Sequence, residues 1–339
     1  MSAGQGEQGV IRVLGTGGTI AGVSHTGRDR DYQAASLSVQ ALVDAVPELA
    51  AARLQVQQVC QVDSKDMGWP QWRLLLQACL DALHDPEVAG VVITHGTDTL
   101  EETALLLQVL LPPLKPVVLT AAMRPATSSL ADGPVNLLLA VRAVQDAVSG
   151  PAAITGRKLH GVAAALHGRL WPALRVRKAH SWIIDAFDGG GMPAAADEGA
   201  ATWPPSWGFM VPELLQRDTL PWVPLLTSHA DAQPQVVAAL LRADPPPAGW
   251  LLATTGHGTV HAALETALQG GQPVWRASRV ARGGIAWDSA GWPSVGPLTP
   301  AQGRLLLSLA LAVSGAEGVC RWLDALRAEP GLDHLLIQD

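Results

Sequence analysis

Two short segments place threonine hydroxyls directly after apolar, strand-like runs of sequence. The first is Gly15-Thr-Gly-Gly-Thr-Ile-Ala-Gly22, and the second is His95-Gly-Thr-Asp-Thr-Leu-Glu-Glu-Thr103. Because an open α/β sheet binds ligands at the carboxyl ends of its strands, we expect both segments at a binding site. Two threonine alcohols at such an edge suggest hydrolysis of an amide through an acyl-enzyme.

The first segment supplies a candidate nucleophile, Thr19. It follows Gly17 and Gly18, which let the backbone approach a ligand closely. A threonine alcohol is weak until a partner accepts its proton, and we expect Tyr32 to be that partner, on a polar loop (residues 21–32) that closes over the site. The alternative is a tight turn or a phosphate loop, but the segment lacks the Walker lysine and does not match the dinucleotide fingerprint.

The second segment offers a hydroxyl and a carboxylate side by side, Thr97 and Asp98. Asp98 is suited to hold a substrate ammonium, and the backbone N–H groups of the helix start would stabilise an oxyanion. The alternative is an ordinary helix start, because Thr99 and Glu102 have the spacing of a capping box.

A basic cluster, Arg175-Val-Arg-Lys-Ala-His180, contains one of the four lysines of the chain, Lys178. Such a cluster is usually a solvated face. A lysine buried near Thr97 and Asp98 would instead be a candidate base or electrostatic support, since burial lowers a lysine pKa.

Ser64 and Lys65 follow a valine-rich strand pattern over residues 56–62. Ser64 is suited to hydrogen-bond a substrate carboxylate, and Lys65 to pair with one. The alternative is another helix start that leads into residues 69–83.

The remaining titratable residues show no metal-ligand spacing. We predict packing or capping roles for four histidines, His95, His160, His167 and His180, and neither a metal nor a cofactor. The three cysteines, Cys60, Cys79 and Cys320, are predicted to be buried thiols in a reducing compartment.

Composition narrows the class of protein. The chain has 339 residues, of which 48% are hydrophobic and 16% charged, and its net charge is -7. Its length favours about two domains, and its acidity argues against nucleic acid or an anionic membrane as partners. Residues 1–8 lack the features of a signal peptide, and no uncharged apolar run reaches roughly 18 residues, so we expect a cytoplasmic protein without a membrane span.

Strand patterns alternate with helix patterns, which predicts a parallel sheet flanked by helices. Strands are expected over residues 10–14, 56–62, 90–94, 116–121, 222–226, 250–254 and 273–278. Helices are expected over residues 36–46, 71–83, 99–111, 136–148, 234–241, 260–268 and 300–313. The fold class is α/β with two domains: a larger N-terminal domain with a mostly parallel sheet and flanking helices (residues 1–188), and a smaller C-terminal α/β domain (residues 222–339). Glycines, prolines and tryptophans mark an interdomain connection over residues 189–221.

Taken together, the motifs resemble the bacterial-type L-asparaginases of the asparaginase/glutaminase family. Besides the two threonine segments, Ala121-Ala-Met-Arg-Pro125 and Ala131-Asp-Gly-Pro-Val-Asn-Leu137 occur in the family's order, and the likeness covers nearly the whole chain. The resemblance implies a cofactor-free amidohydrolase, a homotetramer built from dimers, that converts L-asparagine to L-aspartate and ammonia.

The resemblance also implies roles for individual residues. Thr19 matches the nucleophile and Tyr32 the loop tyrosine that assists it, while Thr97, Asp98 and Lys178 match a second catalytic set. The substrate would be bound by Ser64, Lys65, Gly96, Thr97 and Asp98, with Ser64 at its α-carboxylate and Asp98 at its α-amino group.

The chain departs from the family pattern at two places. Lys65 replaces a common glutamine, which implies either a second positive partner for the α-carboxylate or a changed preference for L-glutamine. A glutamate that relatives lend to the neighbouring subunit falls near Ala290 here, whereas Thr259 in a retained turn could reach that site.

Two other classes of function remain open at this point. One is an amino-acid-binding sensor with weak or lost catalysis, and the other is the asparaginase-like subunit of a tRNA-dependent amidotransferase. The acidic charge and the lack of an added N-terminal domain weaken the second.

Overall fold

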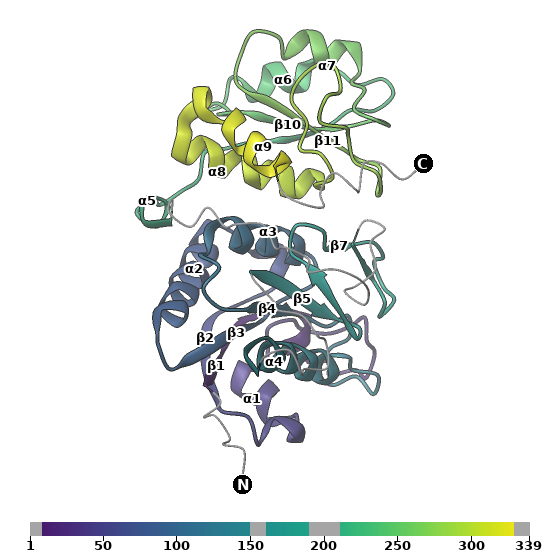
Figure 1. Ribbon diagram of the computed structural model, residues 1–339. Helices are drawn as coiled ribbons and strands as arrows, with labels where there is room; N and C mark the ends of the chain where they lie inside the picture. Colours follow the sequence, from purple (N-terminus) through teal and green to yellow (C-terminus); the bar gives the residue numbers. More distant parts are fainter. Residues whose placement is uncertain (1–8, 150–160, 190–210, 329–339) are drawn as a thin grey trace. The chain divides into compact units, whose positions relative to one another are not determined.

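The computed structural model describes residues 9–149, 161–189 and 211–328 (Figure 1). These residues form two compact units, the first within residues 9–189 and the second from residue 211 onward. His160 and residues 190–210 of the predicted connection lie outside the described residues.

The first unit is built on a six-stranded sheet in the order β2-β1-β3-β4-β5-β6. All neighbours are parallel except β5 and β6, so the prediction of a mostly parallel sheet is confirmed. The strands are β1 (Val10–Gly17), β2 (Leu54–Val62), β3 (Val88–Thr94), β4 (Val117–Thr120), β5 (Val162–Leu166) and β6 (Arg169–Pro172). A separate two-stranded hairpin pairs β7 (Arg177–Lys178) with β8 (Phe187–Asp188).

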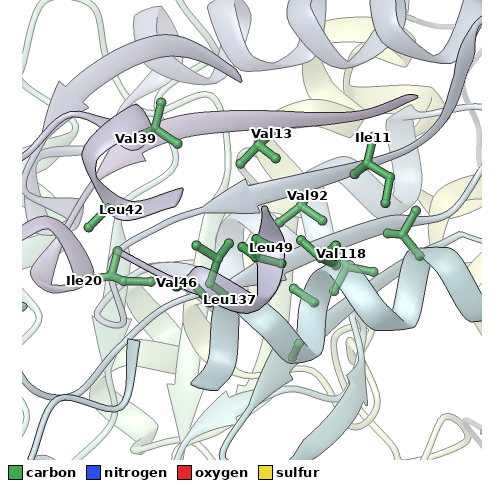
Figure 2. Close-up of a cluster of buried hydrophobic side chains, with 14 of the residues drawn as sticks. Ile11, Val13, Ile20, Val39, Leu42, Val46, Leu49, Val92, Val118 and Leu137 are labelled. Carbon is green, nitrogen blue, oxygen red and sulfur yellow. The ribbon is translucent and has the colours of Figure 1, made fainter. Parts of the chain in front are cut away.

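Helices cover both faces of this sheet. Helices α1 (Val39–Asp44) and α4 (Gly133–Ser149) lie on one face, and α2 (Trp69–His84) and α3 (Leu100–Leu110) lie on the other (Figure 1). Figure 2 shows the apolar cluster beneath α1 and α4, in which side chains of β1, β3 and β4 are fully buried. Because these strands are covered on both faces, they are apolar almost throughout.

The strand order reverses at β1, whose neighbours are β2 on one side and β3 on the other. Chain connections leave such a point in opposite directions, and ligands bind in the crevice that this opens outside the carboxyl ends of the strands. The two threonine segments follow β1 and β3, and Ser64 follows β2. The fold therefore brings all three to the same edge of the sheet.

The second unit contains a three-stranded parallel sheet in the order β11-β10-β9. Its strands are β9 (Leu225–Thr227), β10 (Trp250–Thr254) and β11 (Val274–Ser278), and its helices are α5 (Val211–Leu215), α6 (Gln235–Leu240), α7 (Ala262–Ala267), α8 (Pro300–Gly318) and α9 (Cys320–Arg327). Helix α8 packs on β10 and β11, and its N-terminus has a capping box in which the Thr299 hydroxyl accepts from the Gln302 N–H at 3.2 Å.

Within the described part of the chain, no single helix is long and apolar enough to cross a membrane. Helices α8 and α9 together meet the criteria of length and composition, but their axes differ by 115°.

The three cysteines differ in exposure. Cys79 is buried and Cys60 half-buried, and burial raises the pKa of the Cys60 thiol to about 11. Cys320 is exposed, so the prediction of a buried thiol there is wrong. Helix α9 is amphipathic and buries Trp322, Leu323 and Leu326, which leaves Cys320 on its outward side.

Candidate active site

Two glycines shape the turn that carries Thr19. Gly17 and Gly18 have φ angles of 110° and 81°, in the region that side chains rarely adopt, and the chain then makes one 3₁₀ turn over Thr19–Ala21. A Cβ atom on Gly18 would overlap the backbone of Gly96. The turn after β1 therefore lies directly against the segment that follows β3.

Thr19 and Tyr32 are in direct contact. The Thr19 Oγ1 lies 2.8 Å from the Tyr32 hydroxyl, and Thr19 is only 8% exposed. The Tyr32 ring packs over Gly22, where an added Cβ would come within 2.7 Å of the ring. Paired backbone hydrogen bonds of 2.9 Å between Val23 and Gln33 close the loop at its base.

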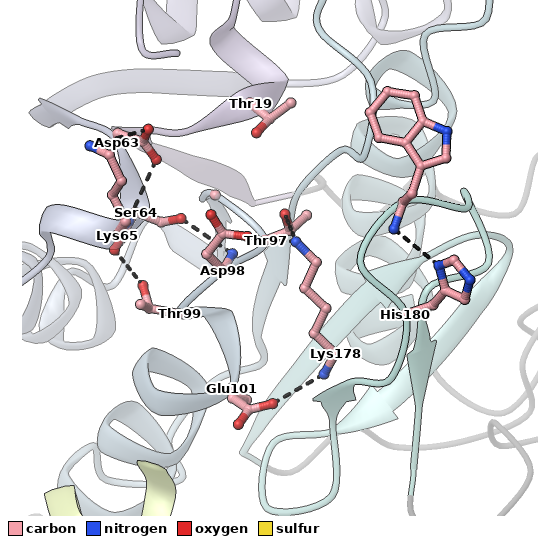
Figure 3. Close-up of polar contacts among 12 residues, drawn as sticks. Thr19, Asp63, Ser64, Lys65, Thr97, Asp98, Thr99, Glu101, Lys178 and His180 are labelled. Atoms are coloured by element: carbon pink, nitrogen blue, oxygen red, sulfur yellow. Dashed lines mark hydrogen bonds and ion pairs between the residues drawn. The ribbon is translucent and has the colours of Figure 1, made fainter. Parts of the chain in front are cut away.

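Thr97, Asp98 and Lys178 form a second connected group. The Lys178 ammonium donates to Thr97 Oγ1 at 2.9 Å and to Asp98 Oδ1 at 2.6 Å. The Lys178 side chain is 19% exposed, whereas that of Asp98 is 55% exposed and accessible to a ligand. Figure 3 shows the Thr19 hydroxyl turned toward this group.

Ser64 connects the end of β2 to the same group. Its Oγ accepts from the Asp98 N–H at 3.3 Å, and its carbonyl accepts from Thr99 Oγ1 at 2.7 Å (Figure 3). The capping box predicted for Thr99 is therefore wrong: Thr99 occupies the N-cap position of α3, but its side chain bonds Ser64 rather than the helix. A Cβ on Gly96 would overlap the Ser64 hydroxyl, so glycine is required for this approach.

Lys65 is engaged by the acidic residues of its own turn. Its ammonium lies 2.5 Å from Asp66 Oδ2 and 3.5 Å from Asp63 Oδ2, and its side chain is 61% exposed. The hydrogen bond to Asp66 is the main cause that raises the Lys65 pKa. Lys65 therefore follows Ser64 in the chain, but in the structure its ammonium is paired with the carboxylates of Asp63 and Asp66.

A buried polar chain lies behind the second segment. The His95 Nδ1 is 2.7 Å from the Gly96 carbonyl and its Nε2 is 3.0 Å from Thr103 Oγ1, which accepts from Trp72 Nε1 at 2.9 Å. Since a carbonyl only accepts, Nδ1 carries the proton and Nε2 accepts from Thr103. Burial lowers the His95 pKa to about 4, so the imidazole is neutral at pH 7.

The hairpin of β7 and β8 positions Lys178. Lys178 pairs with Phe187 across the hairpin, and its N–H donates to the Glu101 carboxylate on α3 at 3.1 Å. Trp182 at the hairpin tip contacts Arg30 and Arg124. Sequence reasoning did not connect these residues, because they are distant in the chain and an arginine near a tryptophan has no local signature.

Thr259 lies in the second unit, on the turn between β10 and α7. Its hydroxyl is 2.7 Å from that of Thr255. The turn borders a cavity of about 340 Å³, at whose wall the buried Arg276 donates to the Gly258 carbonyl at 2.8 Å. Thr259 as a cross-subunit residue stays a prediction.

Within the described residues, no group of three or more histidine, cysteine, aspartate or glutamate side chains is arranged to hold a metal ion.

Comparison with known proteins identifies the family. Residues 10–203 match the family model "Asparaginase, N-terminal". The probable periplasmic L-asparaginase of Haemophilus influenzae is 34% identical over 319 residues, which cover 89% of this chain and 88% of the relative. This chain belongs to the asparaginase family of enzymes.

Two further similarities extend over both units of this asparaginase-family chain. A glutaminase-asparaginase of Acinetobacter glutaminasificans is 32% identical over 323 residues, which cover 89% of this chain and 94% of the relative. A solved structure, the probable cytoplasmic L-asparaginase from Campylobacter jejuni, is 30% identical with a TM-score of 0.79, and the match covers 94% of this chain and 99% of that one. The α/β fold is that of an asparaginase.

Proposed function

We propose that the protein hydrolyses the side-chain amide of L-asparagine to L-aspartate and ammonia through an acyl ester on Thr19. One observation carries this proposal: the Thr19–Tyr32 pair and the Thr97–Lys178–Asp98 group lie at the carboxyl ends of the neighbouring strands β1 and β3. Acyl transfer requires a nucleophile beside a proton acceptor, together with groups that stabilise developing charge, and these two groups of residues supply both.

In the first step, the Thr19 Oγ attacks the amide carbon. The Tyr32 hydroxyl, 2.8 Å away, accepts the Thr19 proton and passes its own proton toward the leaving nitrogen. The carbon–nitrogen bond breaks, and ammonia leaves. Because the proton moves through a hydroxyl, the relay leaves no net charge on Tyr32.

In the second step, water attacks the ester carbon and the bond between that carbon and Thr19 Oγ breaks. A proton of the water passes to the Thr19 oxygen, and L-aspartate leaves. Thr97 and Lys178 support this chemistry from the other side. The Thr97 oxygen accepts from the Lys178 ammonium at 2.9 Å, which directs the Thr97 proton toward the reacting group. The positive charge of Lys178 favours developing negative charge nearby.

Substrate binding is assigned to the groups around Ser64. The exposed Asp98 carboxylate would hold the α-ammonium, and the buried Ser64 hydroxyl would bind the α-carboxylate. Gly96 allows the close approach of backbone and ligand, and Lys65 would contact the α-carboxylate by exchanging its ion pairs with Asp63 and Asp66 for the substrate.

The similarity to a glutaminase-asparaginase supports L-glutamine as a second substrate. We extend the proposal to a cytoplasmic homotetramer in which Thr259 reaches a neighbouring subunit's site. The relatives carry both locations in their names, since one is periplasmic and another cytoplasmic.

Parallel assays of ammonia release from L-asparagine, L-glutamine and a few further β-amides related to L-asparagine test the proposal, with calorimetry on L-aspartate as a binding control. We expect turnover with L-asparagine at the highest kcat/KM. Binding of L-aspartate without ammonia release from any amide would contradict the proposal and support a sensor.

A further inference from the structure

The hairpin that supplies Lys178 also reaches the loop that carries Tyr32. Lys178 lies at the base of the hairpin, and Trp182 lies at its tip. The His180 Nδ1 accepts from the Trp182 N–H at 3.0 Å and from the Ile183 N–H at 3.2 Å. These bonds fix the backbone of the hairpin tip, and with it the point from which the Trp182 side chain extends.

Two arginines stack on the Trp182 ring. The guanidinium carbon of Arg30 lies 4.4 Å from the ring centroid, and that of Arg124 lies 4.0 Å from it. Arg30 belongs to the Tyr32 loop, whereas Arg124 follows β4. A guanidinium at this distance from an indole face is attracted by the ring's negative face.

Arg124 links the hairpin and the loop a second time. Its Nη1 donates to the Trp182 carbonyl at 3.3 Å, and its Nε lies 3.3 Å from Asp29 Oδ2 on the loop. The Arg124 side chain is only 11% exposed, so water competes little for these contacts. The Asp132 carboxylate accepts the Arg124 backbone N–H at 3.0 Å and holds the arginine in place.

The start of the loop is fixed by hydrogen bonds of its backbone to the segment that follows Arg124. The Ala126 N–H donates to the Gly22 carbonyl at 2.9 Å, and the Ser24 N–H donates to Thr127 Oγ1 at 2.9 Å. Tyr32 lies beyond these bonds and two residues after Arg30. The next residue, Gln33, is held by its paired backbone hydrogen bonds with Val23, so the position of Tyr32 depends on Arg30 on one side and on Gln33 on the other.

We propose that Trp182 is a positioning residue that holds the Arg30 segment, and with it the Tyr32 hydroxyl, against Thr19. A single hairpin thus positions Lys178 on one side of the site and Tyr32 on the other. The predicted effect of Trp182 on turnover rests on the proposed function. Its predicted effect on the position of Tyr32 does not depend on that function.

Tyr32 is the only tyrosine of the chain, which allows a direct test. Protein labelled with 3-fluorotyrosine gives one fluorine resonance, and that resonance reports the environment of Tyr32. We expect Trp182→Leu to shift and broaden it, and the matched control Trp222→Leu, at a half-exposed tryptophan of the second unit, to leave it unchanged. An unchanged resonance in folded Trp182→Leu protein would overturn the proposal.

A second variant guards against misfolding at Trp182. Arg30 is exposed, so Arg30→Gln should leave the melting temperature unchanged and still move the resonance in the same direction as Trp182→Leu. Arg28→Gln, at an exposed arginine of the same loop, is its control. A resonance that responds equally to Arg28→Gln and Arg30→Gln would contradict a specific role of the tryptophan.

Kinetics separate positioning from simple structural support. Two stacked guanidiniums predict a roughly ten- to hundredfold loss of kcat in Trp182→Leu, with a smaller change in KM. Trp182→Phe keeps an aromatic face and should recover most of the loss. Equal values of kcat in Trp182→Leu and Trp182→Phe would count against the stacking. If the parent enzyme releases no ammonia, the proposed function fails, but the fluorine experiment still decides the role of Trp182.

Discussion

Thr97 and Thr19 follow neighbouring strands, but the groups beside them are held by different kinds of contact. The Thr97 segment rests on His95, Thr103 and Trp72, a hydrogen-bonded chain that is almost wholly buried. Tyr32, the partner of Thr19, lies on a loop held by the exposed Arg30, which stacks on Trp182, and by an ion pair between Asp29 and the mostly buried Arg124.

The difference suggests a division of roles within the site. Buried hydrogen bonds are strong because water cannot replace them, whereas contacts near solvent open at little cost. We therefore interpret the Thr97 side as a fixed platform and the Tyr32 loop as the part that opens to admit substrate. The following variants break or sharpen this contrast.

The largest expected effect comes from removing a reacting group of the platform. Thr97→Val removes the hydroxyl that accepts from Lys178 but keeps the shape of the side chain. We expect kcat to fall by about 10²- to 10³-fold, at an unchanged melting temperature. Steady-state ammonia release measures this, with Thr219→Val at an exposed site as control. Near-normal turnover would remove Thr97 from the mechanism.

The platform itself should be sensitive to the loss of one buried hydroxyl. Thr103→Val leaves Trp72 Nε1 without its acceptor and His95 Nε2 without its donor. Unsatisfied buried groups of this kind lower the free energy of unfolding by about 2 to 4 kcal/mol. Urea denaturation at constant m-value measures the change. If Thr103→Val lowers the free energy of unfolding by less than a threonine-to-valine change at an exposed site, the chain of hydrogen bonds does not support the platform.

The protonation of His95 should make the platform sensitive to acid. Burial lowers its folded-state pKa to about 4, whereas the unfolded value is about 6.5. The unfolded chain therefore binds the proton first, and stability falls as the pH decreases from about 6.5 toward 4. The parent should lose about 2 kcal/mol of its free energy of unfolding between pH 7 and pH 5 through His95, and we expect His95→Gln to abolish this part of the loss. Parallel pH profiles of the variant and its parent would contradict the assignment.

The loop should show the smallest energetic effect. Arg30 is exposed, so its stacking on Trp182 stabilises the closed loop by only about 0.5 to 1 kcal/mol. Arg30→Gln should lower kcat about two- to fivefold without a measurable change in urea denaturation. In a double-mutant cycle with Trp182→Leu, the two effects should be less than additive. Strict additivity would mean that the two residues act independently.

The strands that carry the site could be predicted from the sequence. Strands β1 and β3 are buried on both faces and are therefore nearly continuous apolar runs. The strand predicted for residues 250–254 has the same bounds in the structure. The local pattern of apolar residues was sufficient to predict a strand where most of the side chains of that strand are buried.

Tertiary partners explain what the sequence did not reveal. Thr99 has the spacing of a capping residue, but the Ser64 carbonyl from another strand end takes its hydroxyl. The hairpin strands Arg177–Lys178 and Phe187–Asp188 are too short to show a period, so the sequence offered Lys178 only as a candidate within a basic cluster, and the family resemblance supplied its place beside Thr97 and Asp98. Contacts of Trp182 with Arg30 and Arg124 join three separate segments and leave no trace in any one of them.

The covalent intermediate is the most direct test of the mechanism. Enzyme mixed with L-asparagine, quenched rapidly in acid and digested, can be analysed by peptide mass spectrometry. We expect an aspartyl group on the peptide that contains Thr19, and neither adduct nor ammonia release in Thr19→Val. An adduct on Thr97 instead, or normal ammonia release by Thr19→Val, would contradict the assignment of Thr19 as the nucleophile.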